Sequence, residues 1–336
     1  MLKKLLSLPI KHRLLILAGV APLALLLAFA PFVFEVLEQP FYLRVASRIL
    51  VFALAASSLN LVLGFGGMVS LGHAAFVGIG SYVVAILAWH ASNEVPLSLG
   101  PFVIAGTTDG LVAWPVAILA AMLSACIIGA ISLRTSGLYF IMITLAFAQM
   151  IYYYAVSLQQ YGGDDGMRMR GRSILPGLDL SNRTTFYYFA LASLALCLIF
   201  LFCLARSRFG LVISGIRQNE TRMRALGIEP YPYQLTCFTI SGAIAGFAGV
   251  LMVNLDSFVS PADLSMARSS ELIAMILIGG VGSLWGPLLG AGFYILGQLG
   301  LGTLTTYWPL FFGPALIVIV LFARRGLVGL FVPGRS

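Results

Sequence analysis

The sequence predicts an all-α, polytopic membrane bundle of about ten transmembrane helices, folded as a single transmembrane domain over residues 1–336. Three observations predict this fold class. Hydrophobic residues make up 60% of the chain and charged residues only 10%. Long apolar runs of roughly 20 residues match the ~30 Å hydrocarbon layer when they are helical. Short polar stretches separate these runs, and helices close every backbone hydrogen bond internally, which lipid requires.

The apolar runs predict where the helices lie. In chain order they cover residues 14–34, 45–64, 69–89, 111–133, 137–157, 185–205, 235–255, 271–301 and 306–323. The run 271–301 differs from the others because several glycines and Pro287 interrupt it in ILIGGVGSLWGPLLGAG. Glycines and a proline at this spacing break a straight helix, so this run predicts two short helices that meet at a turn near Gly282.

The amino-terminal run imitates a signal peptide. Four basic residues, Lys3, Lys4, Lys11 and Arg13, precede it, and a small-x-small AFA motif lies near its end, at 28–30. Pro31 stands directly after that motif, and the run has full spanning length, so we expect an uncleaved first helix.

Four cysteines fall inside apolar runs without the paired spacing that frames disulfides or holds zinc. They are Cys126, Cys197, Cys203 and Cys237. We interpret them as packing residues and predict no metal site.

The distribution of charge predicts the orientation. With ten crossings and both termini in the cytoplasm, most of the 20 lysines and arginines lie inside, as the positive-inside rule requires. The net charge of +8 then reflects orientation and attraction to an anionic inner leaflet of the membrane. Nucleic-acid binding is the weaker interpretation, because no soluble segment carries a basic face with interleaved aromatic residues.

The cytoplasmic segment 206–233 is unusually charged and includes IRQNETRMRALGIE at 216–229. Apolar residues of this segment share one stripe on a helical net, while the charged residues lie largely off it. The stripe consists of Val212, Ile213, Ile216, Met223 and Leu226. Gly227 stands where a helix commonly ends, and Pro230 and Pro232 prevent its continuation. The pattern predicts one short amphipathic helix at the inner surface, which would rest on lipid, remain a solvated loop, or dock against a protein.

Four stretches of the chain carry a recognisable combination of motifs. They are SLNLVLGFGGMVSLGHAAFVGIGSY (58–82), SGLYFIMITLAFAQM with YGGDDGM (136–150 and 161–167), GIRQNETRMRALGIEPYPYQLTCFTISGAIAGFAG (215–249) and VSPADLSMARSSELIAMILIGGVGSLWGPLLGA (259–291). Together they resemble the permease subunits of branched-chain amino acid ABC transporters, more closely the M-type than the H-type subunit.

The resemblance implies that segment 206–233 is the counterpart of the coupling helix that contacts the ATPase in related importers. Carried over by position, Glu220, Ala225, Leu226 and Gly227 form the coupling core, with Arg217 and Asn219 beside it. The chain departs from the family at 221–224, where TRMR stands in place of ERAA-like small residues. We expect this difference to tune the choice of ATPase partner.

The chain lacks the motif of a nucleotide-hydrolysing motor, since no G-x-x-x-x-G-K-[ST] and no Gly-Lys pair occurs in it. No Ser/His/Asp or Cys/His cluster predicts enzyme chemistry either. We therefore expect no cofactor in this chain, with ATP and magnesium bound by two partner ATPase subunits. The resemblance implies a second homologous permease subunit and a periplasmic substrate-binding protein as further partners.

Polar residues in the middle of the apolar runs are mostly neutral, whereas proton- or sodium-coupled transporters usually carry buried charge. The pathway candidates are Asn60, His73, Thr144, Gln149 and Asn254. Each has an alternative role as an interhelical hydrogen bond. For His73, a packing role is favoured over substrate contact.

The main periplasmic loop, 158–184, mixes acids with arginines and includes Asp164, Asp165, Arg168 and Arg170. Mixed charge on a glycine-turned loop suits docking of a charged binding protein, with a solvated loop as the alternative.

Together with these observations, the resemblance implies an ABC importer permease that moves branched-chain or other apolar amino acids by ATP-driven alternating access. Urea, amides and aromatic acids are alternative cargoes. The rival classes are an autonomous channel or facilitator for a small neutral solute, and a structural membrane scaffold.

Overall fold

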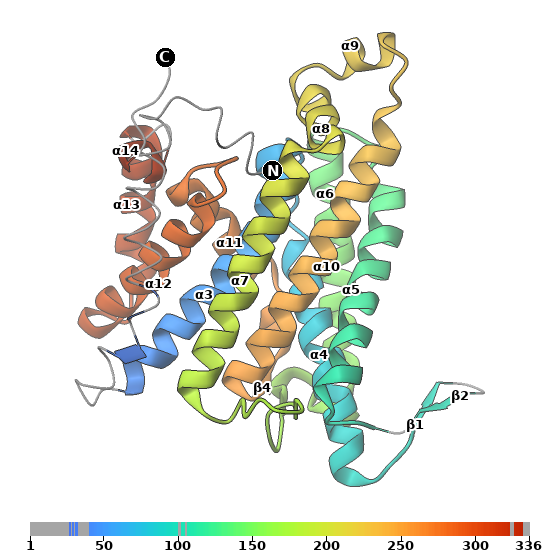
Figure 1. Ribbon diagram of the computed structural model, residues 1–336, viewed down its shortest axis with the longest axis vertical. Coiled ribbons are helices and arrows are strands. Elements are labelled where there is room, and N and C mark those ends of the chain that lie inside the picture. Colours follow the sequence, from blue (N-terminus) through green and yellow to red (C-terminus); the bar gives the residue numbers. More distant parts are fainter. Residues whose placement is uncertain are drawn as a thin grey trace.

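The computed structural model describes residues 27, 29, 31–32, 40–99, 102–104, 106–322 and 326–331. Within these residues the chain forms a bundle of long helices, with two small two-stranded sheets at one end (Figure 1). The predicted first helix, 14–34, and the basic residues before it fall almost entirely outside the described residues.

The long helices follow the apolar runs closely. They are α3 (Pro40–Asn60), α4 (His73–Asn93), α5 (Gly110–Ser132), α6 (Leu138–Ser157), α7 (Arg183–Arg206) and α10 (Pro230–Asp256). The shorter helices are α8 (Arg208–Gln218), α9 (Glu220–Ala225), α11 (Met266–Gly279), α12 (Gly286–Leu304), α13 (Trp308–Phe322) and α14 (Val328–Phe331). A π-helix, η1 (Leu61–Phe65), continues α3.

Six of the described helices are long and apolar enough to cross a membrane, with η1 extending the first of them. They correspond to six of the predicted runs. Helices α11, α12 and α13 account for the two remaining carboxyl-terminal runs but are not among the six. The predicted total of about ten crossings is therefore not confirmed.

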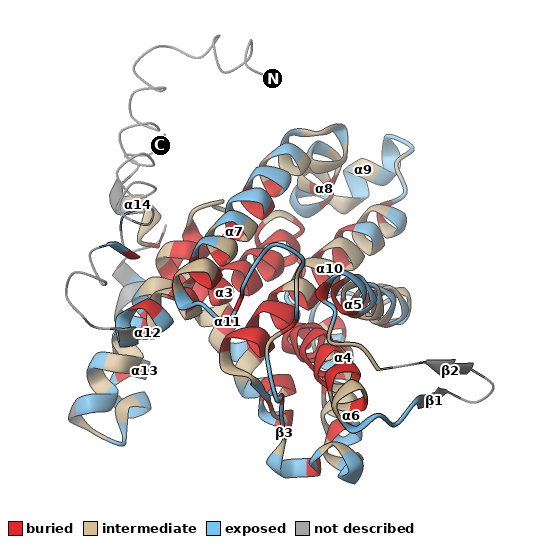
Figure 2. Ribbon diagram, turned by 60° about the horizontal axis from the view of Figure 1, so that its bottom comes forward, coloured by how far each residue is buried: buried red, intermediate tan, exposed pale blue. Residues whose placement is uncertain are grey.

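Helices α3, α4 and α10 form the centre of the bundle, and α5, α6 and α7 are more exposed (Figure 2). The apolar windows of the three central helices are 78%, 72% and 67% buried, against 33%, 22% and 28% for the other three. Small residues allow the central helices to approach closely. A Cβ atom on Gly249 of α10 would lie 1.9 Å from the Val77 carbonyl oxygen of α4, so only glycine fits there.

The interrupted run is a helix pair, as predicted. Helix α11 ends at Gly279, and α12 begins at Gly286. Between them, Gly280 and Gly282 adopt φ values of 118° and 77°, which favour glycine. A Cβ on Gly290 would lie 1.7 Å from the Met275 carbonyl oxygen, so the two helices pack back to back in tight contact.

The two ends of the bundle differ in structure. One end carries α8 and α9, which project beyond the long helices (Figure 1). The other end, here called the loop end, carries the connections between α4 and α5, α6 and α7, and α10 and α11. Its strands are β1 (Leu97–Leu99), β2 (Phe102–Ile104), β3 (Met167–Arg168) and β4 (Phe258–Val259). Its 3-10 turns are η2 (Gln159–Tyr161), η3 (Gly163–Asp165) and η4 (Pro261–Leu264).

Candidate functional site

Segment 206–233 forms two helices, α8 and α9, and the prediction of one continuous helix is wrong. The break is at Asn219, whose backbone is extended at φ −161° and ψ 101°. Its side-chain oxygen accepts a hydrogen bond from the Arg222 backbone N–H at 2.9 Å, which caps α9. Asparagine competes with helical hydrogen bonding in this way, so it ends one helix and begins the next.

The apolar stripe predicted for this segment is only partly buried. Ile213 and Ile216 of α8 are buried against the bundle. Met223 folds back toward α8, since a Cβ on Gly215 would meet its sulfur at 2.8 Å. Leu226 is 69% exposed, so it does not extend the buried stripe.

Residues 219–227, here called the tip, are held by hydrogen bonds within the segment itself. The Glu220 carboxylate pairs with Arg224 at 2.7 Å, and both side chains are substantially exposed. The predicted helix end at Gly227 is confirmed: its φ is 81°, and its N–H donates to the Arg224 carbonyl at 2.9 Å. Ala225 and Leu226 are exposed beside it. The tip therefore presents a self-contained surface.

Arg217 lies two residues before the tip, and although the residue is exposed, its side chain reaches η1. Its guanidinium donates to the Gly64 carbonyl of η1. A Cβ on Gly67 would lie 2.7 Å from Arg217 Cγ, and one on Gly282 would lie 3.6 Å from Nη1. Arg217 thus lies against both η1 and the turn of the broken helix pair.

Asn60 fixes that same turn from the end of α3. Its Nδ2 donates to the Ser283 carbonyl at 2.8 Å, and its Oδ1 accepts from the Gly282 N–H at 2.9 Å. Gly64 is confined between them, because a Cβ there would lie 2.3 Å from Asn60 Oδ1 and 2.6 Å from the Gly282 nitrogen. We call Asn60, Gly64, Arg217 and Gly282 the root. It joins the α8 and α9 segment to the turn of the broken helix pair.

The other pathway candidates are mainly buried inside the bundle. His73 is fully buried, and its Nε2 lies 3.1 Å from the hydroxyls of both Ser58 and Ser241. Asn254 accepts a hydrogen bond from the Ser173 backbone N–H at 2.7 Å. Both side chains therefore form hydrogen bonds inside the bundle.

Thr144 and Gln149 lie on α6, which is the least buried of the membrane-length helices. Thr144 is buried, and its hydroxyl bonds its own helix at the Ile141 carbonyl, 2.9 Å away. Gln149 is partly exposed. Of the five candidates, Gln149 therefore comes nearest to an open surface of this chain.

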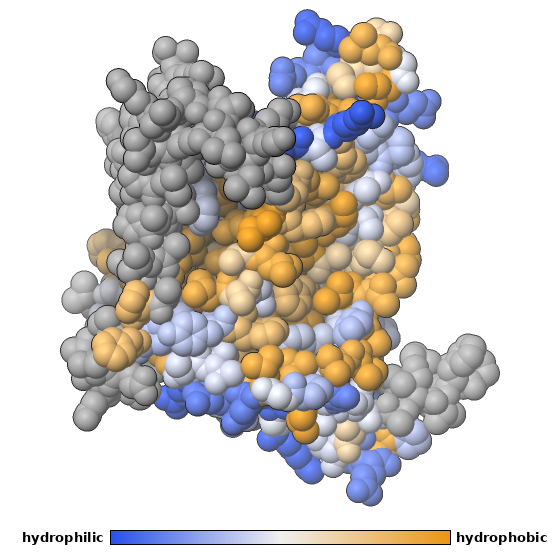
Figure 3. All heavy atoms as spheres, viewed as in Figure 1, coloured by the Kyte–Doolittle hydropathy of each residue, from blue (hydrophilic) through white to orange (hydrophobic). Residues whose placement is uncertain are grey.

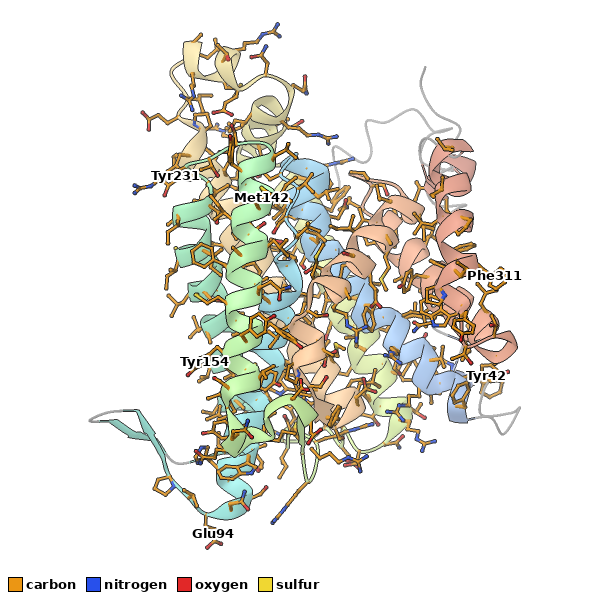
Figure 4. The ribbon with its side chains drawn as sticks, turned by 180° about the vertical axis from the view of Figure 1, so that it is seen from behind. Tyr42, Glu94, Met142, Tyr154, Tyr231 and Phe311 are labelled. Carbon is orange, nitrogen blue, oxygen red and sulfur yellow. The ribbon has the colours of Figure 1, made fainter. Side chains whose placement is uncertain are left out.

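The exposed faces of α5 and α6 have different chemistry. The exposed large residues of α5 are all aliphatic: Leu111, Val112, Val116, Leu119, Leu123, Ile127 and Ile131. Those of α6 include hydroxyl and thioether groups: Leu138, Tyr139, Met142, Met150, Tyr153 and Tyr154. Figure 4 shows Met142 and Tyr154 on the outward side of α6. The α5 face suits lipid tails, whereas the α6 face also suits a more polar neighbour.

The predicted docking residues lie on an ordered part of the loop end. Asp164 and Asp165 are exposed in η3, and Arg168 is exposed in β3, which pairs with β4. Arg170 donates to the Ser92 carbonyl at 3.2 Å. The four residues therefore project from a short sheet and turn. Met167 and Met169 are buried and anchor this part of the loop end.

An ion-paired cluster at the start of α11 was not singled out from the sequence. Arg268 pairs with Asp263 at 2.9 Å and Glu271 at 2.7 Å, and it lies over the Phe52 ring at 5.3 Å. The spacing of opposite charges around Arg268 in SPADLSMARSSE is the signal that could have found it. The cluster fixes η4 and α11 to α3.

Six membrane-length helices beside a broken helix pair, with a projecting segment tied to the turn of that pair, define a polytopic membrane protein. The chain matches the family described as the permease component of branched-chain amino acid transport systems over residues 41–322. It belongs to that family and is a permease subunit.

Two curated relatives support the family. The high-affinity branched-chain amino acid transport system permease proteins LivM of Salmonella typhimurium and Escherichia coli are each 27% identical over 311 residues. Each alignment covers 84% of this chain and 69% of the relative. No solved structure matches the chain.

Proposed function

We propose that this chain is one of two permease subunits of a bacterial ABC importer, moving a branched-chain or other apolar amino acid across the inner membrane. The cargo class follows from the relatives, which are named for high-affinity branched-chain amino acid transport. The alternative of an autonomous channel is not favoured by these matches.

The connection between tip and root is the observation that carries this proposal. The tip is exposed and has the predicted coupling residues Asn219, Glu220, Ala225, Leu226 and Gly227. Arg217 connects the same segment to Gly64 and the Gly282 turn. In our proposal two cytoplasmic ATPases, which bind the ATP and magnesium, contact the tips of the two permease subunits. Their closure moves the root and shifts the bundle between two states of access.

The remaining partners are assigned by surface chemistry. The second, homologous permease would face α6, where tyrosine and methionine side chains and Gln149 offer a less strictly apolar surface than the aliphatic face of α5. The periplasmic binding protein would dock on Asp164, Asp165, Arg168 and Arg170 at the loop end. With the tip in the cytoplasm, both termini are cytoplasmic as well.

The test is coupled transport in liposomes. The chain is purified with a second permease and the ATPase subunits, and ATP hydrolysis and uptake of labelled leucine are measured with the loaded binding protein. Arg217→Gln removes a charged hydrogen bond to Gly64, so uptake should fall about tenfold or more while the complex still assembles. The matched control is Arg134→Gln, an exposed arginine between α5 and α6, which should leave uptake unchanged.

Two results would overturn the proposal. Equal uptake by the Arg217→Gln complex and the unaltered complex would show that the root does not transmit ATPase closure to the bundle. Solute flux through the chain alone, without ATPases, would instead identify a facilitator. Parallel uptake assays with urea, an amide and an aromatic acid test the cargo class.

A further inference from the structure

A cavity of about 220 Å³ opens at the loop end, between the ends of three long helices. Its polar and aromatic lining comes from Arg44, Ser47, Arg172, Arg183, Phe186, Asp256 and Ser257. Arg44 lies in the second turn of α3, Arg183 begins α7, and Asp256 ends α10. Because the ends of membrane-length helices lie near the headgroup layer, the cavity is placed at the membrane boundary.

Positive charge is in excess around this cavity, with three arginines and one aspartate in its lining. Arg44 pairs with Asp256 at 2.9 Å. Arg172 donates to the Leu180 carbonyl and stacks on the Phe186 ring at 5.1 Å. Arg183 makes no ion pair with any residue that the structure describes. One carboxylate therefore leaves two guanidinium groups without a countercharge among the lining residues.

The arginines also act on one another. Burial and repulsion by Arg44 and Arg183 lower the pKa of Arg172, against the opposing attraction of Asp179 and Asp256. An anion in the cavity would relieve this repulsion. Guanidinium groups suit phosphate because their N–H groups bind its oxygens in pairs.

The surroundings favour a lipid as the source of that anion. Phe41, Tyr42 and Tyr188 are exposed near the same ends of α3 and α7, as in the aromatic belt of a membrane interface. Further along α7 the exposed residues Leu196, Ile199 and Phe200 offer apolar surface to acyl chains. A hydrophilic edge lies below the apolar face of the bundle in Figure 3.

We propose that this cavity binds the phosphate of an anionic phospholipid headgroup. Arg183 and Arg172, the two arginines without a countercharge in the lining, contact the phosphate oxygens, and Phe186 and the Leu180 carbonyl hold Arg172 in place. Arg44, paired with Asp256, forms part of the cavity wall. The site goes beyond the transport function and does not depend on it.

The experiment measures thermal unfolding of the purified full chain in mild detergent. Dihexanoyl-phosphatidylglycerol should raise the unfolding temperature at a lower concentration than dihexanoyl-phosphatidylcholine. Arg183→Gln should raise the half-maximal lipid concentration about fivefold, since one arginine near a membrane surface contributes that much to anionic lipid binding. Arg183→Lys should keep most of the affinity. Arg168→Gln, an exposed arginine of the same end outside the cavity, is the matched control.

Each contrary result identifies a different occupant. Equal weakening by Arg168→Gln would mean diffuse attraction to charge. Inorganic phosphate acting at the same concentration as the lipid would mean a free-anion site. Lipid binding unchanged in Arg183→Gln, with docking of the binding protein lost, would assign the cavity to a protein carboxylate. Glu35 and Glu38 lie outside the described residues. If the Glu35→Gln, Glu38→Gln double variant bound lipid more tightly, these two acids would compete with the lipid, and the cavity would be assigned to them. Any of these results would overturn the proposal.

Discussion

The tip and the root meet at segment 206–233, where Arg217 belongs to the root, but they are stabilised in opposite ways. The tip closes its hydrogen bonds locally, through the Asn219 cap, the Glu220 to Arg224 pair and the Gly227 turn. The root joins residues that are far apart in sequence, since Arg217 contacts Gly64 and Asn60 contacts Gly282 and Ser283. Substitutions in the tip should therefore have local effects, whereas substitutions in the root should disturb the packing of the bundle.

The largest effect on stability is expected from Gly64→Ala in the root. The new Cβ would overlap Asn60 Oδ1 and the backbone of Gly282, so it would overpack the site and break both hydrogen bonds of the turn. We expect a loss of about 3 kcal/mol or more, measured by thermal or denaturant unfolding in detergent. Gly302→Ala is the control, because a Cβ at this α12 position has no neighbour within 4 Å among the described residues. Equal stability of the two variants would show that the root is not tightly packed.

Asn60→Ala tests the same turn without adding atoms. It leaves the Gly282 N–H and the Ser283 carbonyl without their partner, at a cost of about 2 kcal/mol. The comparison is Gln298→Ala, a partly exposed amide of α12, measured by the same unfolding assay. Similar unfolding temperatures of both variants would show that the two hydrogen bonds of Asn60 do not stabilise the turn.

At the tip, Asn219→Ala should act locally. Loss of the cap should destabilise α9 by about 1 kcal/mol, so amides of α9 should exchange hydrogen about fivefold faster while global unfolding stays the same. Gln218→Ala, an exposed change at the adjacent position, should leave exchange unaltered. Faster exchange throughout the bundle would mean that tip and root are not separable.

The smallest effect on stability is expected from Glu220→Lys. Its ion pair with Arg224 is largely solvated, so its loss should cost about 0.5 kcal/mol or less. The same change should uncouple ATP hydrolysis from uptake in the reconstituted complex, because it reverses a charge on the surface that we propose contacts the ATPases. Glu94→Lys makes the same charge change at the loop end and is the control for uptake. Normal coupling in Glu220→Lys would remove the functional role of the tip.

Sequence patterns predicted the helices but not the contacts between them. Six apolar runs form membrane-length helices in the structure. The turn at Gly282 could be located from the glycines and Pro287, because these residues break a helix locally. The break at Asn219 was missed because the apolar stripe continues across it, although asparagine is a strong helix-capping residue.

The root could not be predicted, because no periodic pattern connects Arg217 to Gly64 over 153 positions. Asn60 was chosen as a polar residue in an apolar run, and only the fold shows that it bonds the Gly282 turn. The arginine cavity was hidden for the same reason, since three separate helix ends assemble it.

The most direct test of the central claim is the side of the membrane on which the tip lies. A Leu226→Cys variant, with exposed Cys203 replaced by serine, is treated with a membrane-impermeant maleimide in spheroplasts and in inside-out vesicles. Asp164→Cys marks the loop end. Our account predicts that Leu226→Cys reacts only in inside-out vesicles and is protected when the ATPases bind, while Asp164→Cys reacts only in spheroplasts. Reaction of Leu226→Cys in intact spheroplasts would contradict the account.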